Sequence, residues 1–294
     1  MDISHYHLTF VANKRISFES YPGSAFRGVF GHGLKEVSCS YPGQACATCQ
    51  LNPDCAYPNL FENQRQVAGQ ARTDPHPFVL DFSMVGFEIG AHDVFTIGVT
   101  FLGRAGEHFD QVCRAWEIAG GLGVGKRLAK FDLVRVEEVN TPAYDMETLF
   151  ALSTPACCFH LVTPFCARKR VNHRRIDIGP NEFEFGPYLV NILHRQNDLI
   201  KLYGDGDKQI DIKALTPTIY DLSMNEQSLE LYQYTRKSYR QDQYLKIRGV
   251  VGWLQITGEG LRSLMPYLLR GQWLHVGNNT IHGCGKYWIE PTAD

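Results

Sequence analysis

The sequence predicts an α+β fold made of two related halves, because one pattern of residues occurs twice. A helix-like segment at 107–119 leads into the glycine-rich basic run 120–127 and then into the strand-like run 131–139. The end of the chain repeats this order around a second glycine-rich run at 277–286. Internal repetition of this kind indicates two copies of one structural unit.

The first half contains six segments in the order strand, helix, strand, strand, helix, strand. Apolar and polar residues alternate at 96–101 with the period of a half-buried strand. This βαββαβ order is that of a ferredoxin-like, RRM-like domain. The expected strands are 5–12, 78–84, 94–102 and 131–139, and the expected helices are 24–38 and 107–119.

The second half is expected to be a longer version of the same unit. Its predicted elements are a strand at 156–165, a helix at 186–203, a strand at 244–256, a helix at 260–269, and the final loop and strand, with an irregular region at 205–233. We therefore predict two tandem domains, residues 1–145 with a cysteine-rich insert at 39–59 and residues 146–294, joined by a linker near 140–154.

The composition is that of a folded protein. Hydrophobic residues make up 44% and charged residues 20% of the 294 positions, and the formal net charge is −2. These values exclude a disordered chain and argue against a general nucleic-acid coat protein, which carries a strongly basic surface. No apolar run approaches the roughly 20 residues that span a bilayer, and residues 1–10 lack the pattern of a signal peptide. We expect a cytoplasmic protein without a membrane partner.

Basic residues are concentrated at a few places, where they are expected to bind a phosphate backbone. Counterion release depends on local charge density, so such clusters bind nucleic acid even in a chain of low net charge. The alternative is that each cluster is only a solvated surface. The candidates are Arg168, Lys169, Arg170, Arg174 and Arg175; Arg236, Lys237 and Arg240 beside Tyr234 and Tyr239, whose rings would stack on bases or serve a structural role; and Lys126 with Arg127.

The glycine-rich run near the carboxyl terminus is expected to form an anion-binding loop. Glycine tolerates positive φ angles, and such a loop exposes backbone N–H groups to a phosphate. Neither glycine-rich run fits the pattern of a nucleotide-binding P-loop, in which serine or threonine follows the lysine. Here the lysine is followed by Arg127 in one run and by Tyr287 in the other. The candidate contacts in the terminal loop are Gly277, Asn278, Gly283, Gly285 and Lys286.

Four of the nine cysteines form a C-x6-C-x2-C-x5-C arrangement. A chain without a signal peptide keeps its thiols reduced, and a C-x2-C pair with two outer cysteines supplies four sulfur ligands in a tetrahedron. We expect structural zinc, with an iron–sulfur cluster as an alternative for the same ligands and four merely reduced thiols as the simpler interpretation. The other cysteines are expected to be core thiols. The candidate ligands are Cys39, Cys46, Cys49 and Cys55.

Several motifs follow one another in a characteristic order. They are 26–34 with the cysteine cluster and 60–62, then 101–105 through 121–125 to 131–134, then 248–252, and finally the terminal glycine-rich loop. This order resembles that of the CRISPR-associated endoribonucleases of the RAMP superfamily, which process precursor CRISPR RNA, in the bacterial branch with a cysteine-rich insert. The resemblance covers both halves of the chain.

The resemblance implies metal-independent cleavage of CRISPR repeat RNA into mature CRISPR RNA. A 2′-hydroxyl attacks the adjacent phosphate and leaves a 2′,3′-cyclic phosphate and a 5′-hydroxyl, which requires a base, an acid and a cation but no cofactor. The implied partners are the repeat RNA, its product and other CRISPR effector subunits. The alternative is a catalytically silent RAMP subunit that binds guide RNA in an effector complex.

The resemblance also implies a catalytic histidine on or just after the first helix, and the matching residue is His32. On a helical wheel, His32 and Lys35 lie opposite the apolar face, and their i, i+3 spacing lets both meet one phosphate. His282 in the terminal loop is the second candidate. The alternative for each histidine is a surface residue without a role. Glycines weaken a helix, so a close approach by RNA or by the second domain would account for Gly28, Gly31 and Gly33.

Overall fold

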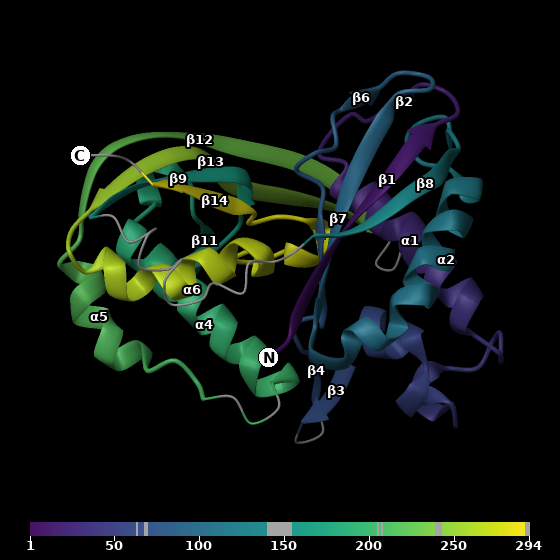
Figure 1. Ribbon diagram of the computed structural model, residues 1–294, viewed down its shortest axis with the longest axis horizontal. Helices are drawn as coiled ribbons and strands as arrows, with labels where there is room; N and C mark the ends of the chain where they lie inside the picture. The colour runs from purple at the N-terminus through teal and green to yellow at the C-terminus, as the bar shows by residue number, and fades with distance from the viewer. Residues whose placement is uncertain are drawn as a thin grey trace. The chain divides into compact units, whose positions relative to one another are not determined.

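The chain divides into two compact units (Figure 1). The computed structural model describes residues 1–62, 64–67, 70–139, 155–204, 206, 208–238 and 243–291. Unit 1 consists of Met1–Val139 with Leu202–Gly206, and unit 2 consists of Asn140–Lys201 with Asp207–Asp294. The expected linker at 140–154 and the expected domain boundary between 145 and 146 lie outside the described residues.

Unit 1 is built on a four-stranded antiparallel sheet and two helices. The sheet order is β5-β7-β1-β8, and every neighbouring pair is antiparallel. A βαββαβ unit with this strand order is ferredoxin-like, so the fold expected for the first half is confirmed. The elements are β1 (Ile3–Ala12), α1 (Gly23–Ser38), β5 (Phe78–Asp81), β7 (Val94–Leu102), α2 (Phe109–Leu122) and β8 (Phe131–Val139).

Shorter elements lie between the main ones of unit 1. The β2 strand (Ile16–Ser17) pairs with β6 (Glu88–Ile89), and β3 (Gln64–Val67) pairs with β4 (Gln70–Thr73). The cysteine-rich segment contains two 3-10 helices, and a π-helix follows it. These are η1 (Cys46–Thr48), η2 (Asn52–Asp54) and η3 (Tyr57–Glu62), and η4 (Gly103–His108) precedes α2.

Aromatic rings fill the core between the helices and the sheet of unit 1. Phe26, Phe30 and Trp116 are fully buried, and the ring centroids of Phe30 and Trp116 lie 4.8 Å apart. The two helices approach closely because a glycine lies at their contact. A Cβ atom at Gly33 would lie 2.2 Å from the carbonyl oxygen of Ala115. The apolar stripe of α1 thereby fixes which face of this helix is left exposed.

Unit 2 repeats the architecture of unit 1. Its main sheet has the order β12-β13-β9-β14, again antiparallel throughout, and Figure 1 shows α4 and α6 on one face of it. The tandem ferredoxin-like fold is therefore confirmed in both halves. The elements are β9 (Ala156–Phe165), α4 (Phe185–Tyr203), β12 (Ser223–Ser238), β13 (Gln243–Thr257), α6 (Leu261–Leu274) and β14 (Tyr287–Pro291).

The expectation of an irregular region at 205–233 is wrong. This part of the chain contains α5 (Ile212–Tyr220) and most of β12. The α5 helix is short and has Pro217 inside it, and it begins where the Asp211 carboxylate accepts a hydrogen bond from the Ala214 N–H at 3.0 Å. The β12 strand lies at the edge of its sheet, so it has many polar residues and lacks a continuous apolar pattern.

Other boundaries differ from the expected ones by a few residues. The α2 helix continues through Gly120 and Gly121 to Leu122, so the first glycine-rich loop is shorter than expected, and α6 continues five residues beyond its expected end to Leu274. Within the described residues, none of the helices has the length and apolar character needed to cross a bilayer.

Candidate nucleic-acid interface and active site

A basic β-hairpin follows β9 in unit 2. It consists of β10 (Arg168–Val171) and β11 (Arg174–Asp177), joined by a two-residue turn at Asn172 and His173 with φ angles of 48° and 64°. Positive φ at both positions is typical of a type I′ turn, whose twist matches that of the paired strands. The turn brings all five basic residues of the first predicted cluster onto one small hairpin.

Two of these five residues are neutralised inside unit 2. The Nε atom of Arg168 lies 2.8 Å from a carboxylate oxygen of Asp177, and the Nζ atom of Lys169 lies 3.0 Å from a carboxylate oxygen of Glu184. Exposed ion pairs add little stability, but they reduce the charge that is available to an external phosphate. Arg168 and Lys169 are therefore weaker RNA-binding candidates than the rest of the hairpin.

The other three residues, Arg170, Arg174 and Arg175, are exposed, and within the described part of the chain their side chains make no ion pair. Arg170 stands directly opposite Arg175 in the β10–β11 register. Like charges in directly opposed positions destabilise a β-hairpin. A bound phosphate would remove this repulsion, so the hairpin has the geometry of an anion-binding element.

The loop between α2 and β8 is a second basic site. Gly120 lies in α2, and the close packing there requires a glycine because a Cβ atom would lie 2.0 Å from the carbonyl oxygen of Phe131. Lys126 and Arg127 are exposed at the loop, and Lys126 forms an ion pair with Glu19. Of the two predicted contacts, Arg127 is the one whose charge is not already paired among the described residues.

The terminal glycine-rich loop has the predicted backbone conformation but not the predicted exposure. Gly277, Gly283 and Gly285 have φ angles of 83°, 78° and 79°. The N–H groups of residues 276, 278 and 282–286 donate hydrogen bonds within unit 2, as the 2.6 Å bond from Asn278 to the carbonyl oxygen of Cys166 illustrates. The expectation of a largely open anion nest is wrong for these amides, because the loop packs on the end of β9. Residues 277 and 279–281 leave their amides outside this network.

Thr163 of β9 holds this loop in place and was missed by sequence reasoning. Its buried hydroxyl donates to the carbonyl oxygen of Gly283 at 2.7 Å and accepts from the N–H of Lys286 at 2.8 Å. The Lys286 ammonium donates to the carbonyl oxygen of Gln272 at 3.1 Å. A threonine within an apolar strand carries no sequence signal for this role, which only the strand register reveals. Lys286 is held at both its backbone and its side chain.

The α1 helix leaves His32 and Lys35 on its exposed face, as the helical wheel predicts. Within the described residues, the His32 imidazole makes no hydrogen bond, ion pair or ring contact. The Lys35 ammonium lies 5.5 Å from the centre of the Tyr57 ring, within cation–π distance. The two predicted catalytic residues therefore share a face of one helix.

The three glycines of α1 have different physical explanations. A Cβ atom at Gly31 would lie 2.2 Å from the ring of Phe61, and Gly33 is required at the contact with α2. Gly28 is exposed, and a Cβ atom there would meet nothing within 4 Å. Glycine inside a helix costs about 1 kcal/mol relative to alanine. Packing inside unit 1 accounts for Gly31 and Gly33 but not for Gly28, which lies one turn before His32.

Several candidates in unit 2 are buried instead of exposed. His282 is 7% exposed and lies in the short helix η6 (Thr280–His282), and Tyr234 is 5% exposed with its hydroxyl 3.6 Å from the sulfur of Cys284. The structural role is thus the one that fits Tyr234. A hydrogen bond from Cys166 lowers the pKa of Cys284, and the charge of the half-buried Arg236 lowers this pKa further. The side chain of Lys237, and residues Tyr239 and Arg240, lie outside the described residues.

The four predicted metal ligands lie around one small cavity in unit 1. All four cysteines are free thiols. Burial raises the pKa of Cys46 and of Cys55, and the neighbouring Cys39 and Cys49 raise that of Cys55 further. Within the described residues, no three His, Cys, Asp or Glu side chains are arranged to hold a metal ion. The cluster in the sequence is a cluster in space, although its sulfur atoms do not form a coordination set.

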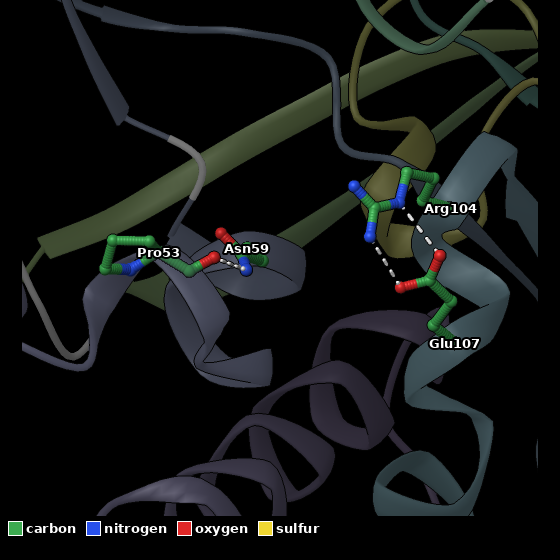
Figure 2. Close-up of polar contacts among 4 residues, drawn as sticks. All are labelled: Pro53, Asn59, Arg104 and Glu107. Carbon is green, nitrogen blue, oxygen red and sulfur yellow. Dashed lines mark hydrogen bonds and ion pairs between the residues drawn. The ribbon is translucent and has the colours of Figure 1, made fainter.

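Unit 1 also contains a cleft of about 550 Å³ that sequence reasoning did not predict. Figure 2 shows two polar pairs at this cleft. Arg104 donates two hydrogen bonds to the Glu107 carboxylate, at 2.8 and 3.1 Å, and the Asn59 amide donates to the carbonyl oxygen of Pro53 at 2.8 Å. His108 also lines the cleft, and burial lowers its pKa. Because Glu107 neutralises Arg104, we assign the cleft no role in binding phosphate.

Family models match both halves of the chain. Residues 1–155 match a model described as an N-terminal domain, and residues 159–287 match the model of the CRISPR-associated endoribonuclease Cas6. Residues 159–287 therefore form a Cas6-family domain. The resemblance expected from the motifs is thus confirmed, while the matches say nothing of a branch with a cysteine-rich insert.

Individual relatives of the chain are distant. An uncharacterized protein of Archaeoglobus fulgidus is 24% identical over 251 residues, which cover 82% of this chain and 80% of that protein. A Cas6 product complex has a TM-score of 0.60 at 15% identity over 98% of this chain and 99% of that chain. A Cas6-related protein from Pyrococcus furiosus has a TM-score of 0.55 at 13% identity over 99% and 100% of the two chains. At these identities the two solved structures show a shared fold.

Proposed function

We propose that this chain cuts CRISPR repeat RNA by attack of a 2′-hydroxyl on the adjacent phosphate, without a catalytic metal ion. The products are a 2′,3′-cyclic phosphate and a 5′-hydroxyl. The family model supports the reaction class, and a similar structure described as a RAMP protein binding different RNA substrates supports RNA as the substrate. A similar structure is described as a Cas6-RT-Cas1–Cas2 complex, which supports other CRISPR proteins as partners.

The observation that carries the proposal is the exposed and unengaged imidazole of His32 on α1. A general acid or base must reach the proton that it transfers, and an imidazole is suited to this role near neutral pH. In the proposed reaction, His32 transfers a proton at the 2′-hydroxyl or at the leaving 5′-oxygen. Lys35, one turn further along the helix, supplies positive charge to the pentacoordinate phosphate.

Gly28 supports the same assignment. A Cβ atom at Gly28 would have no other atom within 4 Å, so the helix surface at this position is open. An RNA backbone can approach the helix there without meeting a side chain. Gly28 and His32 are four residues apart and therefore lie on the same face. A phosphate close to Gly28 would stand beside the imidazole of His32.

Unit 2 holds the RNA in this proposal. Arg170, Arg174 and Arg175 of the hairpin contact phosphates as unpaired charges. The terminal loop adds the partly exposed backbone amides of residues 277 and 279–281 and the exposed side chain of Asn278. The remainder of the loop, with His282 and Lys286, is a rigid support that the hydrogen bonds to β9 and α6 maintain.

A catalytically silent RNA-binding subunit is the second candidate, and one observation favours it. A catalytic base is usually oriented by a third group, and within the described residues His32 has no such partner. The RNA would then have to orient the imidazole itself, or His32 would have no catalytic role.

Incubation with end-labelled repeat RNA in buffer containing EDTA separates the two functions. A cut that leaves a cyclic phosphate identifies the endoribonuclease, and binding without a cut identifies the silent subunit. His32→Ala is expected to slow single-turnover cleavage by about 10²- to 10⁴-fold with repeat affinity nearly intact.

Two histidine variants serve as controls for His32→Ala. His194→Ala changes an exposed helical histidine of unit 2 and should cleave as the unaltered chain does. His282→Ala tests the buried candidate of the terminal loop. If His282→Ala abolishes cleavage in a folded protein and His32→Ala does not, the assignment of the active site to α1 is wrong.

A further inference from the structure

The four cysteines belong to a segment without a hydrophobic core of its own. We call residues 39–55 the cysteine lobe. Its two 3-10 helices, η1 and η2, contain no buried residue. From 40 to 54, the only side chains that are not exposed are those of Cys46, Cys49 and Asn52. The residues that face inward are therefore thiols, with one amide between them.

The thiols of the cysteine lobe converge on a space of atomic size. Cys39, Cys46, Cys49 and Cys55 all line one cavity of about 20 Å³. A volume of about 10–15 Å³ is sufficient for one water molecule, so this cavity suits a single small ion. The Asn52 amide donates to the carbonyl oxygen of Cys46 at 2.8 Å and fixes the backbone of the first ligand turn.

The backbone of the lobe has the turns that a metal knuckle requires. The Cys49 N–H donates to the carbonyl oxygen of Cys46 at 3.1 Å, and the Cys55 N–H donates to that of Asn52 at 3.4 Å. The C-x2-C pair thereby lies on one tight turn. Most of the lobe is exposed, and among the described residues its thiols are not arranged as metal ligands, so zinc binding requires side-chain rotations that bring the sulfur atoms from the cavity wall to the roughly 2.3 Å distance of a zinc–sulfur bond.

The cysteine lobe has neither an apolar core nor a disulfide to stabilise it. Ordering its backbone costs conformational entropy, and small segments that bury no apolar surface are usually held by a disulfide or a metal ion. All four cysteines are free thiols, so no disulfide holds the lobe and the thiols are available as metal ligands. We propose that Cys39, Cys46, Cys49 and Cys55 bind one Zn²⁺ ion as a tetrahedral set of four thiolates.

The chemistry of the site is structural. Binding converts four thiols and one Zn²⁺ into a tetrathiolate complex and releases four protons to solvent. Four sulfur ligands leave no open position for water or substrate, so the ion takes no part in a hydrolytic step. This inference is consistent with a metal-independent cleavage and does not require it.

The position of the lobe suggests what the ion does for the protein. The lobe connects the end of α1 to η3, where Tyr57 lies under the Lys35 ammonium and Phe61 packs at Gly31. A Zn²⁺ ion bound by the cysteine lobe would hold η3 in place against α1. If the proposed function is correct, the ion also stabilises the helix that carries His32.

Metal analysis of the full chain, purified without chelators, tests the site directly. We expect close to one zinc per chain. Replacement of the zinc by Co²⁺ should give the visible absorption of a tetrahedral thiolate complex, which four unrelated thiols do not produce. The double variant Cys46→Ser with Cys49→Ser should lose both the zinc and this absorption.

The matched control is Cys113→Ser with Cys158→Ser, which removes two half-buried thiols outside the lobe and should retain the metal. If the lobe variant does not fold, the unaltered chain is treated with a chelator and digested briefly with a protease. Cleavage within 39–55 should accelerate on chelation and return to its original rate when Zn²⁺ is added.

Two results would overturn the inference. One is a folded chain that binds neither Zn²⁺ nor Co²⁺, which leaves the lobe as four reduced thiols. The other is iron with the absorption of an iron–sulfur cluster, which excludes zinc. Metal content and proteolysis do not depend on RNA cleavage, so a zinc-bound chain that fails to cut RNA would refute the proposed function and leave the zinc site intact.

Discussion

The unpaired arginines of the β10–β11 hairpin allow a quantitative test of the proposed RNA interface. The test variant combines Arg170→Gln, Arg174→Gln and Arg175→Gln and keeps the two basic residues that are already paired with carboxylates. If each arginine contacts one phosphate, the slope of log K against log salt should become shallower by about 0.7–0.9 for each, or about 2–3 in total.

The same slope gives the change in affinity that an experiment would detect. Raising the salt concentration four-fold, from about 50 to 200 mM, should weaken the binding of both proteins. The factor by which the unaltered chain loses affinity should be about 20 to 40 times the factor for the variant. Filter binding or fluorescence anisotropy with labelled repeat RNA, at several salt concentrations, measures both quantities. The variant should bind more weakly at every salt concentration in this range.

The fold provides an independent check on the same variant. Because Arg170 stands opposite Arg175, their replacement should leave stability unchanged or raise it by up to about 1 kcal/mol. Arg262→Gln is the control, since this exposed arginine of α6 is paired with Glu259 and has no proposed RNA contact. An unchanged salt slope in a folded triple variant would show that the hairpin is a solvated surface and refute the reasoning.

Two further predictions concern stability. Thr163→Val should destabilise unit 2 by about 1–3 kcal/mol, because two backbone groups of the terminal loop lose their partner, whereas Thr163→Ser should behave almost as the unaltered chain in urea unfolding. Burial lowers the pKa of His108 below its ordinary value near 6.5, so the stability it confers is complete above about pH 6.5 and is lost as the pH falls through the folded-state pKa. His108→Gln should therefore reduce the loss of unfolding free energy on acidification; an identical pH profile would contradict this.

The regular elements of both units could be predicted because their residues repeat with the period of a helix or a strand. The β7, β8 and β9 strands have the predicted bounds, and α1 differs by one residue at its start. The α5 helix and the β12 strand could not be predicted in this way. The α5 helix has a proline inside it, and β12 is a polar edge strand whose conformation depends on its pairing with β13 and not on an apolar pattern of its own.

The candidate site residues also differ in how far the sequence could predict their surroundings. The face of α1 that carries His32 followed from periodicity, since a residue opposite a buried stripe is exposed wherever the helix packs. The pairing of Lys169 with Glu184, and of Lys126 with Glu19, could not be predicted, because each joins residues from different elements. A cluster of charges in the sequence therefore overstates the charge that remains free in the fold.

The burial of the terminal loop favours His32 over His282 as the proposed general acid or base. His282 could reach an RNA only if its loop separated from the end of β9. That movement would break the hydrogen bond from Asn278 to Cys166 and the hydrogen bond from Thr163 to Gly283. Each of these bonds contributes about 1 kcal/mol, so opening the loop for catalysis would cost several kcal/mol before any chemistry began. His32 needs no such rearrangement, because its helix face is open in the folded chain. The imidazole that requires no conformational change is the better general acid or base.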